Sequence, residues 1–148
     1  MSHITILLYG TGIDVKYQRI QVILTCCQHT LYEKILVVDD DEDILTMLKN
    51  FLQAKGYDVK VTLTCEEGLI VFYAYQPDLV MLDVNVGSDD GRLMCRKIKS
   101  QANYQHIPVI LISANSEGLK SYVDYGAVAA VEKPFQFVSL LGLIESHM

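Results

Sequence analysis

Beginning at residue 34, short apolar runs alternate with segments whose apolar residues recur at helical spacing. The apolar runs predict strands at 34–38, 58–62, 79–82, 109–112 and 128–131. The periodic segments predict helices at 41–55, 66–75, 91–101, 116–125 and 135–146. Gly56 and Gly126 are C-terminal stops for two of these helices. This part of the chain is therefore predicted to form five strand–helix pairs.

Strands that alternate with helices of this length form βαβ units, and the right-handed crossovers of such units make the sheet parallel. The predicted strands are apolar on both faces, as expected where helices cover both sides of a sheet. The expected fold is α/β, with a doubly wound parallel sheet. Ligands bind to such sheets outside the carboxyl ends of the strands.

Polar side chains stand at four of these predicted carboxyl ends. Asp39 and Asp40 follow the first strand, Asp83 the third, Ser113 the fourth and Lys133 the fifth. If the strands are parallel, all of these side chains meet at one edge of the sheet. Carboxylates, a hydroxyl and an ammonium gathered there could hold a divalent cation and a phosphate.

The composition excludes several classes of protein. The 148 residues carry a net charge of −6 without a cluster of Lys or Arg, so direct binding of nucleic acid is not expected. No apolar run approaches the roughly 20 residues that cross a bilayer, so no membrane association is expected. Cys26, Cys27, Cys65 and Cys95 show no metal-binding or redox spacing and are interpreted as free thiols. A single cytoplasmic domain is the expectation.

The same motifs resemble a known family. Four segments carry the resemblance: Lys34–Glu42, Pro77–Asp83 with Gly91 eight residues later, His106–Ala114, and Gly126–Ala127 followed by Lys133-Pro134-Phe135. In order and spacing they resemble the receiver domain of response regulators in two-component signalling. The resemblance implies a flavodoxin-like (βα)5 fold with strand order 2-1-3-4-5, and it assigns residues 33–148 to the receiver domain.

The resemblance also implies roles for individual residues. Asp83 is the expected phospho-acceptor, and Lys133 and Ser113 are expected to assist the phosphoryl transfer. Mg²⁺, or Mn²⁺ in its place, is the expected cofactor. Its expected ligands are Asp40 and Asp83 directly, Asp39 through water, and the backbone carbonyl of Asn85.

The implied function is that of a phosphorelay response regulator. A sensor histidine kinase or a histidine phosphotransfer protein would supply the phosphoryl group, and phosphorylation would control binding to an output partner. Because the chain stops two residues after Ser146, a stand-alone receiver similar to chemotaxis regulators is expected. A homodimer is among the expected assemblies. The protein is expected to be a phospho-acceptor and not an enzyme.

Two other functions remain open at this point. One is a pseudo-receiver, an interaction module that is never phosphorylated, although the intact acidic, hydroxyl and lysine positions argue against it. The other is a small Mg²⁺-dependent phosphatase that uses an aspartyl phosphate. Such an enzyme needs an acid two residues after the nucleophile, where this chain has Asn85.

Single residues also have simpler interpretations. The acids at 39–43 suit a helix N-terminus. Ser113 could cap the next helix, in competition with Asn115 or Ser116. Lys133 could be a solvated loop lysine. Asp89 and Asp90 are expected only to solubilise their loop, and His106 to flank a strand without binding metal.

The chain departs from the family pattern at two positions. Ala130 stands three residues before Lys133, where receivers commonly carry Tyr or Phe as a switch residue. Signalling is therefore expected to pass through the helix at 116–125, with Tyr122 and Tyr125 as candidate reporters. Gly87 replaces a common proline and is expected to loosen the loop after Asp83.

Residues 1–32 lie outside the resemblance. Their pattern permits a helix, with Ile20, Leu24, Cys27 and Leu31 at helical spacing, and it also permits strands around Gly10-Thr11-Gly12. The extension is either upstream sequence translated from a misplaced start or a real segment that packs on the domain or mediates dimerisation.

Overall fold

The computed structural model describes residues 32–148, and their main sheet is parallel. Its strands are β1 (Lys34–Val38), β2 (Asp58–Thr62), β3 (Leu79–Asp83), β6 (Val109–Ser113) and β7 (Ala129–Glu132). They lie in the order β2-β1-β3-β6-β7, and each neighbouring pair is parallel. This arrangement confirms the predicted order 2-1-3-4-5, because β6 and β7 are the fourth and fifth strands of this sheet.

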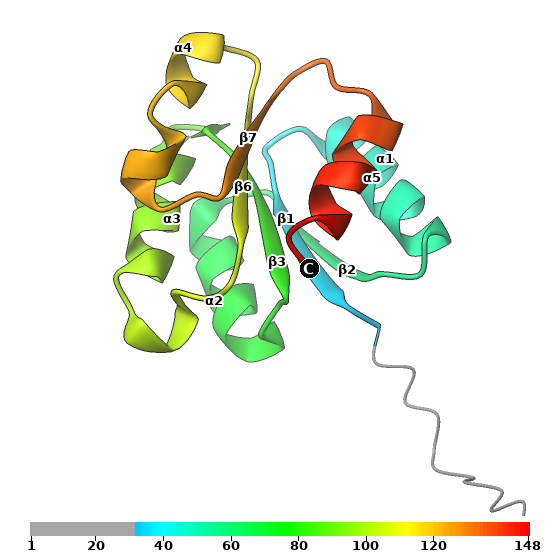
Figure 1. The fold of residues 1–148 in the computed structure, drawn as a ribbon, viewed down its shortest axis with the longest axis horizontal. Coiled ribbons are helices and arrows are strands. Elements are labelled where there is room, and N and C mark those ends of the chain that lie inside the picture. Colours follow the sequence, from blue (N-terminus) through cyan, green and yellow to red (C-terminus); the bar gives the residue numbers. More distant parts are fainter. Residues whose placement is uncertain (1–31) are drawn as a thin grey trace, which may run out of the picture.

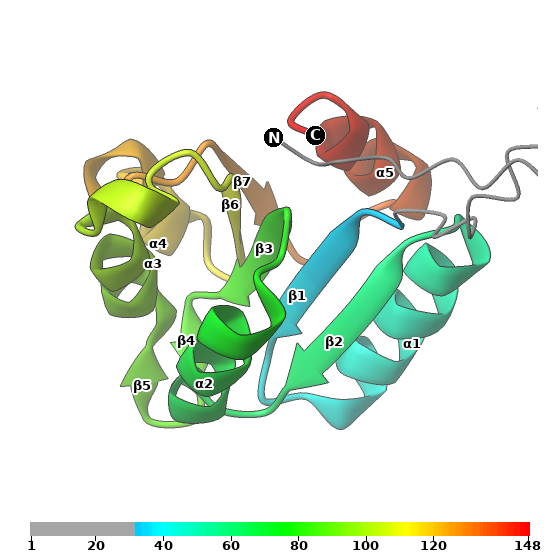
Figure 2. The ribbon, with the colours of Figure 1, turned by 90° about the horizontal axis from the view of Figure 1, so that it is seen from below.

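Helices cover both faces of the sheet (Figures 1 and 2). They are α1 (Glu42–Ala54), α2 (Cys65–Tyr75), α3 (Gly91–Lys99), α4 (Ser116–Leu119) and α5 (Phe137–Glu145). Figure 1 shows α1 and α5 on one side and α2, α3 and α4 on the other. The doubly wound α/β architecture predicted from the sequence is therefore confirmed.

The apolar strand residues divide between two cores by strict alternation. Ile35 and Val37 of β1 pack on the α1–α5 side, whereas Leu36 and Val38 pack on the α2–α4 side. The side chains of a strand alternate between its faces, so a strand covered on both sides is apolar throughout. In β3, Met81 packs on the α1–α5 side. Asp83 stands two residues later in the same strand, so its side chain is on that same side. The covered sheet thus holds rigidly the residues at its carboxyl edge.

Local signals explain where the helices begin and end. Asp41 caps α1, because its carboxylate accepts hydrogen bonds from the amides of Asp43 and Ile44. Gly56 follows α1 with a φ of 95°, a conformation that glycine adopts without strain, so the predicted stop is confirmed.

The helix predicted at 116–125 is wrong in its extent. The structure has the short helix α4 and then a 3₁₀ helix, η2 (Tyr122–Tyr125). Gly118 and Ser121 weaken the helical propensity of this segment, and Ser121 departs from helical dihedrals. A shorter 3₁₀ helix, η1 (Ala102–Tyr104), likewise follows α3 before Gln105.

A two-stranded antiparallel hairpin follows Asp83 and was not predicted. It consists of β4 (Asn85–Val86) and β5 (Asp89–Asp90), with Gly87 in the turn at a φ of 61°. Glycine suits a tight turn that requires positive φ. The segment expected to be a loosened loop thus has hydrogen-bonded structure.

The predictions made for residues 1–31, including those for Cys26 and Cys27, lie outside the described residues. Cys65 and Cys95 are buried and free, as the sequence suggested. Within residues 32–148, no helix has the length and apolar character to cross a membrane.

Candidate functional site

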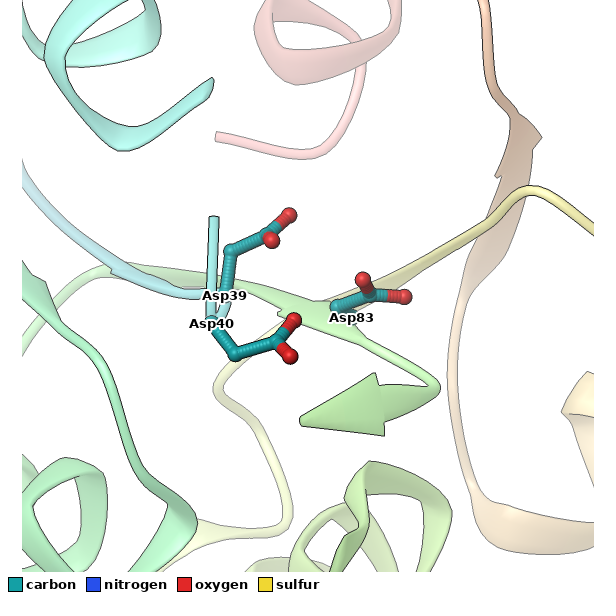
Figure 3. A group of neighbouring side chains, drawn as sticks. All are labelled: Asp39, Asp40 and Asp83. Carbon is teal, nitrogen blue, oxygen red and sulfur yellow. The ribbon is translucent and has the colours of Figure 1, made fainter. Parts of the chain in front are cut away.

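Three carboxylates gather where β1 and β3 end (Figure 3). Asp39, Asp40 and Asp83 each offer an oxygen atom, and these atoms all lie within 4.8 Å of one another. Asp39 and Asp83 are buried, whereas Asp40 is exposed. The site can therefore be approached from solvent but is anchored in the core.

Backbone hydrogen bonds fix the two buried carboxylates. The amide of Asp41 donates to Oδ1 of Asp39 at 3.0 Å, and the amide of Asn85 donates to Oδ1 of Asp83 at 3.3 Å. The amide of Asp39 itself donates to the carbonyl of Thr62 at 3.2 Å, which ties this residue to β2. Each buried carboxylate therefore keeps its second oxygen for other partners.

Lys133 occupies the position between those second oxygens. Its Nζ lies 2.6 Å from Oδ2 of Asp39 and 2.7 Å from Oδ2 of Asp83. The lysine side chain is 14% exposed, and its backbone amide donates to the carbonyl of Ser113 at 2.8 Å. The interpretation of Lys133 as a solvated loop lysine is therefore wrong. The interpretation of the acids at 39–43 as mere helix-terminal charges is also wrong for Asp39.

Burial and pairing shift the pKa values of two of these groups. Burial raises the pKa of Asp39 above 3.8, although hydrogen bonds from Lys133 and the Asp41 amide oppose the shift. Burial alone would lower the pKa of Lys133, but its hydrogen bonds to Asp39 and Asp83 outweigh burial and raise it above 10.5. Lys133 is therefore fully charged at neutral pH and neutralises part of the acidic cluster.

Ser113 is buried at the end of β6, next to the strand that carries Asp83. Its Oγ accepts a hydrogen bond from the amide of Asn115 at 3.1 Å, so the hydroxyl proton is free to donate. The cap of α4 is Asn115, whose side chain accepts from the amide of Glu117. The interpretation of Ser113 as that cap is therefore wrong.

Gly91 brings the start of α3 against the backbone of Asp83. A Cβ atom on Gly91 would lie 1.9 Å from the carbonyl oxygen of Asp83. The amide of Gly91 donates to the carbonyl of Val84 at 2.9 Å. Only glycine permits this approach, so Gly91 helps to set the backbone that carries Asp83. The spacing of Gly91 to Asp83 was noted in the sequence, but the contact depends on the hairpin between them.

Asp90 has a structural role that the sequence analysis missed. Its carboxylate caps α3 by accepting from the amide of Arg92, and it forms an ion pair with the Arg92 guanidinium at 2.8 Å. The prediction that Asp90 only solubilises the loop is thus wrong, whereas Asp89 is exposed. An aspartate directly before a helix is an N-cap signal, so the sequence contained the clue.

Asn85 and His106 are both exposed. Asn85 is exposed beside Asp83, and a metal-binding role for its carbonyl stays a prediction. His106 is exposed before β6 and is not part of the carboxylate cluster.

The sheet order and this site define the class of protein. The family model described as the response regulator receiver domain matches residues 35–145, and the chain belongs to that family. It is 35% identical over 117 residues to the transcriptional regulatory protein YxdJ of Bacillus subtilis, a match that covers 78% of this chain and 50% of that protein. It is also 35% identical over 115 residues to the uncharacterized transcriptional regulatory protein YvcP of the same organism, covering 76% and 47%. The chain spans about half the length of these curated relatives.

Solved structures share the fold. The chemotaxis response regulator CheY4 of Vibrio cholerae superposes with a TM-score of 0.73 at 25% identity, covering 79% of this chain and 99% of that one. The BeF3-activated N-terminal receiver domain of RstA from Klebsiella pneumoniae gives a TM-score of 0.70 at 26% identity, covering 77% and 97%. The chain therefore has the receiver fold of two-component response regulators.

Proposed function

We propose that the protein is a phosphorelay response regulator that accepts a phosphoryl group on Asp83. The observation that carries the proposal is the ion pair of Lys133 with both Asp39 and Asp83 at the carboxyl edge of the sheet. This ion pair places a fixed positive charge beside an accessible cluster of carboxylates. The family match and its transcriptional regulators support the same conclusion.

The proposed reaction begins at the carboxylate of Asp83. One of its oxygen atoms attacks the phosphorus of a phosphohistidine on a sensor kinase or phosphotransfer protein. The phosphorus–nitrogen bond breaks, the imidazole nitrogen leaves with the bonding electrons and takes up a proton, and an acyl phosphate forms on Asp83. Phosphoryl transfer depends mainly on alignment and charge neutralisation, which a rigid sheet edge can supply.

The donor set fits a divalent cation such as Mg²⁺ or Mn²⁺. Three carboxylates face one another, and the single charge of Lys133 leaves a net charge of about −2 when all three are ionised. Hard oxygen ligands at such spacing suit Mg²⁺, which keeps several waters in proteins. Asp39, Asp40, Asp83 and the carbonyl of Asn85 would hold it. When bound, the cation would offset charge repulsion between these carboxylates and the incoming phosphoryl oxygens.

Lys133 and Ser113 would act after transfer. Lys133 can exchange one of its carboxylate partners for a phosphoryl oxygen without losing its pairing with Asp39. Ser113 can donate its hydroxyl proton to another phosphoryl oxygen. Because its carbonyl also accepts from the Lys133 amide, movement at either residue would be transmitted to the other.

The role in the cell follows from this chemistry. We propose a phospho-acceptor that acts in the cytoplasm through phosphorylation-dependent binding of an output partner, and not a phosphatase or other enzyme. The curated relatives are about twice as long as the region that matches this chain. The pseudo-receiver alternative is less favoured, because the acidic, hydroxyl and lysine groups are all positioned at the site.

Phosphorylation from a small donor tests the proposal. Acetyl phosphate with Mg²⁺ should add the mass of one phosphoryl group to the intact protein, and EDTA should stop the reaction. Asp83→Asn should abolish the mass gain, whereas Asp124→Asn in η2 should react like the parent. Equal labelling of Asp83→Asn and the parent would contradict the assignment of the acceptor.

A further inference from the structure

The outer face of α2 and α3 displays large apolar side chains that no element of the described chain covers. Ile70 leaves 64% of its surface exposed, Leu93 57% and Tyr73 37%. The two helices lie side by side on one side of the sheet (Figures 1 and 2), and their buried residues Phe72 and Met94 share a core cluster. We call the surface formed by Ile70, Tyr73 and Leu93 the α2–α3 face. Large exposed apolar side chains on two neighbouring helices are candidates for an interaction surface.

The composition of α2 is unusual for a surface helix. Its only charged residues are Glu66 and Glu67 in the first turn, and its outward positions farther along include Ile70, Tyr73 and Ala74. A helix that is apolar on nearly all sides is typically covered by other protein. The sheet covers only one side of α2, so its outer side is suited to a partner.

Tyr73 is held in place before any partner arrives. The side-chain amide of Gln101 donates to the Tyr73 hydroxyl at 2.6 Å, and the ring centroids of Tyr73 and Tyr104 lie 5.7 Å apart. An aromatic side chain that is already ordered loses little conformational entropy on binding, which favours it as an anchor residue.

The charges at the two ends of the face are opposite in sign. The exposed Glu66 and Glu67 stand in the first turn of α2, at the end of the sheet that carries the acidic site. The exposed Lys97 stands in the last turn of α3, farther toward the other end. A two-fold axis perpendicular to the two helices would bring the acidic end of the face in one copy to the basic end of the face in the other copy. An isologous interface requires this self-complementarity.

We propose that the α2–α3 face binds a second copy of this chain. The helices of the two copies run antiparallel, Ile70 and Tyr73 pack near the two-fold axis, and Glu66 or Glu67 of each copy pairs with Lys97 of the other. This contact does not involve the carboxylate site, so it forms whether or not Asp83 is phosphorylated.

The first test measures the mass of the unphosphorylated full-length protein by sedimentation equilibrium over a wide range of concentrations. The parent is expected to approach twice its monomer mass, and Ile70→Glu is expected to raise the dissociation constant of the dimer at least about tenfold. The control is Val138→Glu on α5, on the opposite side of the sheet, where the valine is 82% exposed. A parent that stays monomeric, or Ile70→Glu and Val138→Glu with equal constants, would overturn the proposal.

A charge exchange tests the orientation. Lys97→Glu alone and Glu66→Lys/Glu67→Lys alone should each weaken self-association, because like charges then face each other. An equimolar mixture of the two variants should recover the parent's affinity as a heterodimer. A mixture no tighter than its components would overturn the proposed pairing. Circular dichroism on each variant confirms that these surface changes leave the fold intact.

Discussion

The ammonium of Lys133 lies 2.7 Å from Oδ2 of Asp83, although the two residues are 50 positions apart in the chain. The same nitrogen also bonds to Asp39, so one cation holds together the ends of β1 and β3 and the segment after β7. Removing it would leave two buried carboxylates beside each other without a counter-charge. The pairing therefore contributes both to stability and to the proposed phosphorylation response.

Lys133→Ala is expected to lower the free energy of unfolding by about 2 kcal/mol or more in EDTA, because it leaves buried carboxylates uncompensated. Mg²⁺ should restore more stability to this variant than to the parent. Denaturant unfolding with and without Mg²⁺ measures both effects. Lys120→Ala serves as the control, since the exposed Lys120–Glu117 pair should contribute within about 0.5 kcal/mol. Equal losses in the two variants would contradict the role of Lys133.

Asp39→Asn is expected to be more stable than the parent at neutral pH in EDTA. Because the pKa of Asp39 is raised in the folded protein, ionising this carboxylate opposes folding. The advantage of the variant should be absent below the unfolded pKa of 3.8, appear as the pH rises above it, and be complete above the folded pKa.

Thermal unfolding across that pH range measures the effect of Asp39→Asn. Asp41→Asn is the matched control, since asparagine caps a helix as well as aspartate and residue 41 is exposed. If Asp39→Asn were instead less stable than the parent at neutral pH, the ionised carboxylate would be a net stabilising group and this account of its pKa would be wrong.

Gly91→Ala is expected to lower stability by about 3 kcal/mol and to slow phosphorylation, because its Cβ would displace the carbonyl of Asp83. The control is Gly142→Ala in α5, where a Cβ meets no atom within 4 Å. That change should stabilise the protein by up to about 1 kcal/mol through helix propensity. Unfolding curves and acetyl phosphate kinetics on both variants make the comparison, and a harmless Gly91→Ala would refute the close approach.

Phosphorylation of Asp83 is expected to change the conformation of the hairpin that follows Asp83 and of the segment that contains α4 and η2. Ala130 packs toward the α2–α4 core but has no ring to move, whereas the ring of Tyr125 lies 4.6 Å from the Arg96 guanidinium and 5.3 Å from that of Arg92. Arg92 in turn pairs with Asp90 of the hairpin after Asp83. We therefore expect beryllium fluoride to shift amide resonances mainly in residues 84–91 and 113–125. Shifts centred on 128–132 with a silent 113–125 would contradict this path.

Sequence patterns were sufficient for the parallel strands and for the polar residues at their carboxyl ends. The β1, β3 and β6 runs are apolar on both faces, which few structures other than a covered parallel strand produce. Once the strands are parallel, Asp39, Asp83 and Lys133 must come together at one edge. The strand order, which makes the first and third strands neighbours, and the role of Lys133 came from the resemblance to receiver domains.

Features that depend on short-range balance were not predictable in the same way. The segment at 116–125 has helical spacing, but Gly118 and Ser121 divide it into α4 and η2. The hairpin of β4 and β5 is two residues on each side, too short for a pattern of alternation. The contact of Gly91 with Asp83 arises from that hairpin, so it could be found only from the structure.

The central claim is that Asp83 becomes an acyl phosphate. Borohydride reduces an aspartyl phosphate to homoserine, so the protein is treated with acetyl phosphate and Mg²⁺, reduced, digested and analysed by tandem mass spectrometry. We expect homoserine at position 83, with one oxygen replaced by two hydrogens, and unchanged aspartate at positions 39 and 40. Homoserine at either of those two positions, or phosphoryl incorporation with Asp83 intact, would contradict the account.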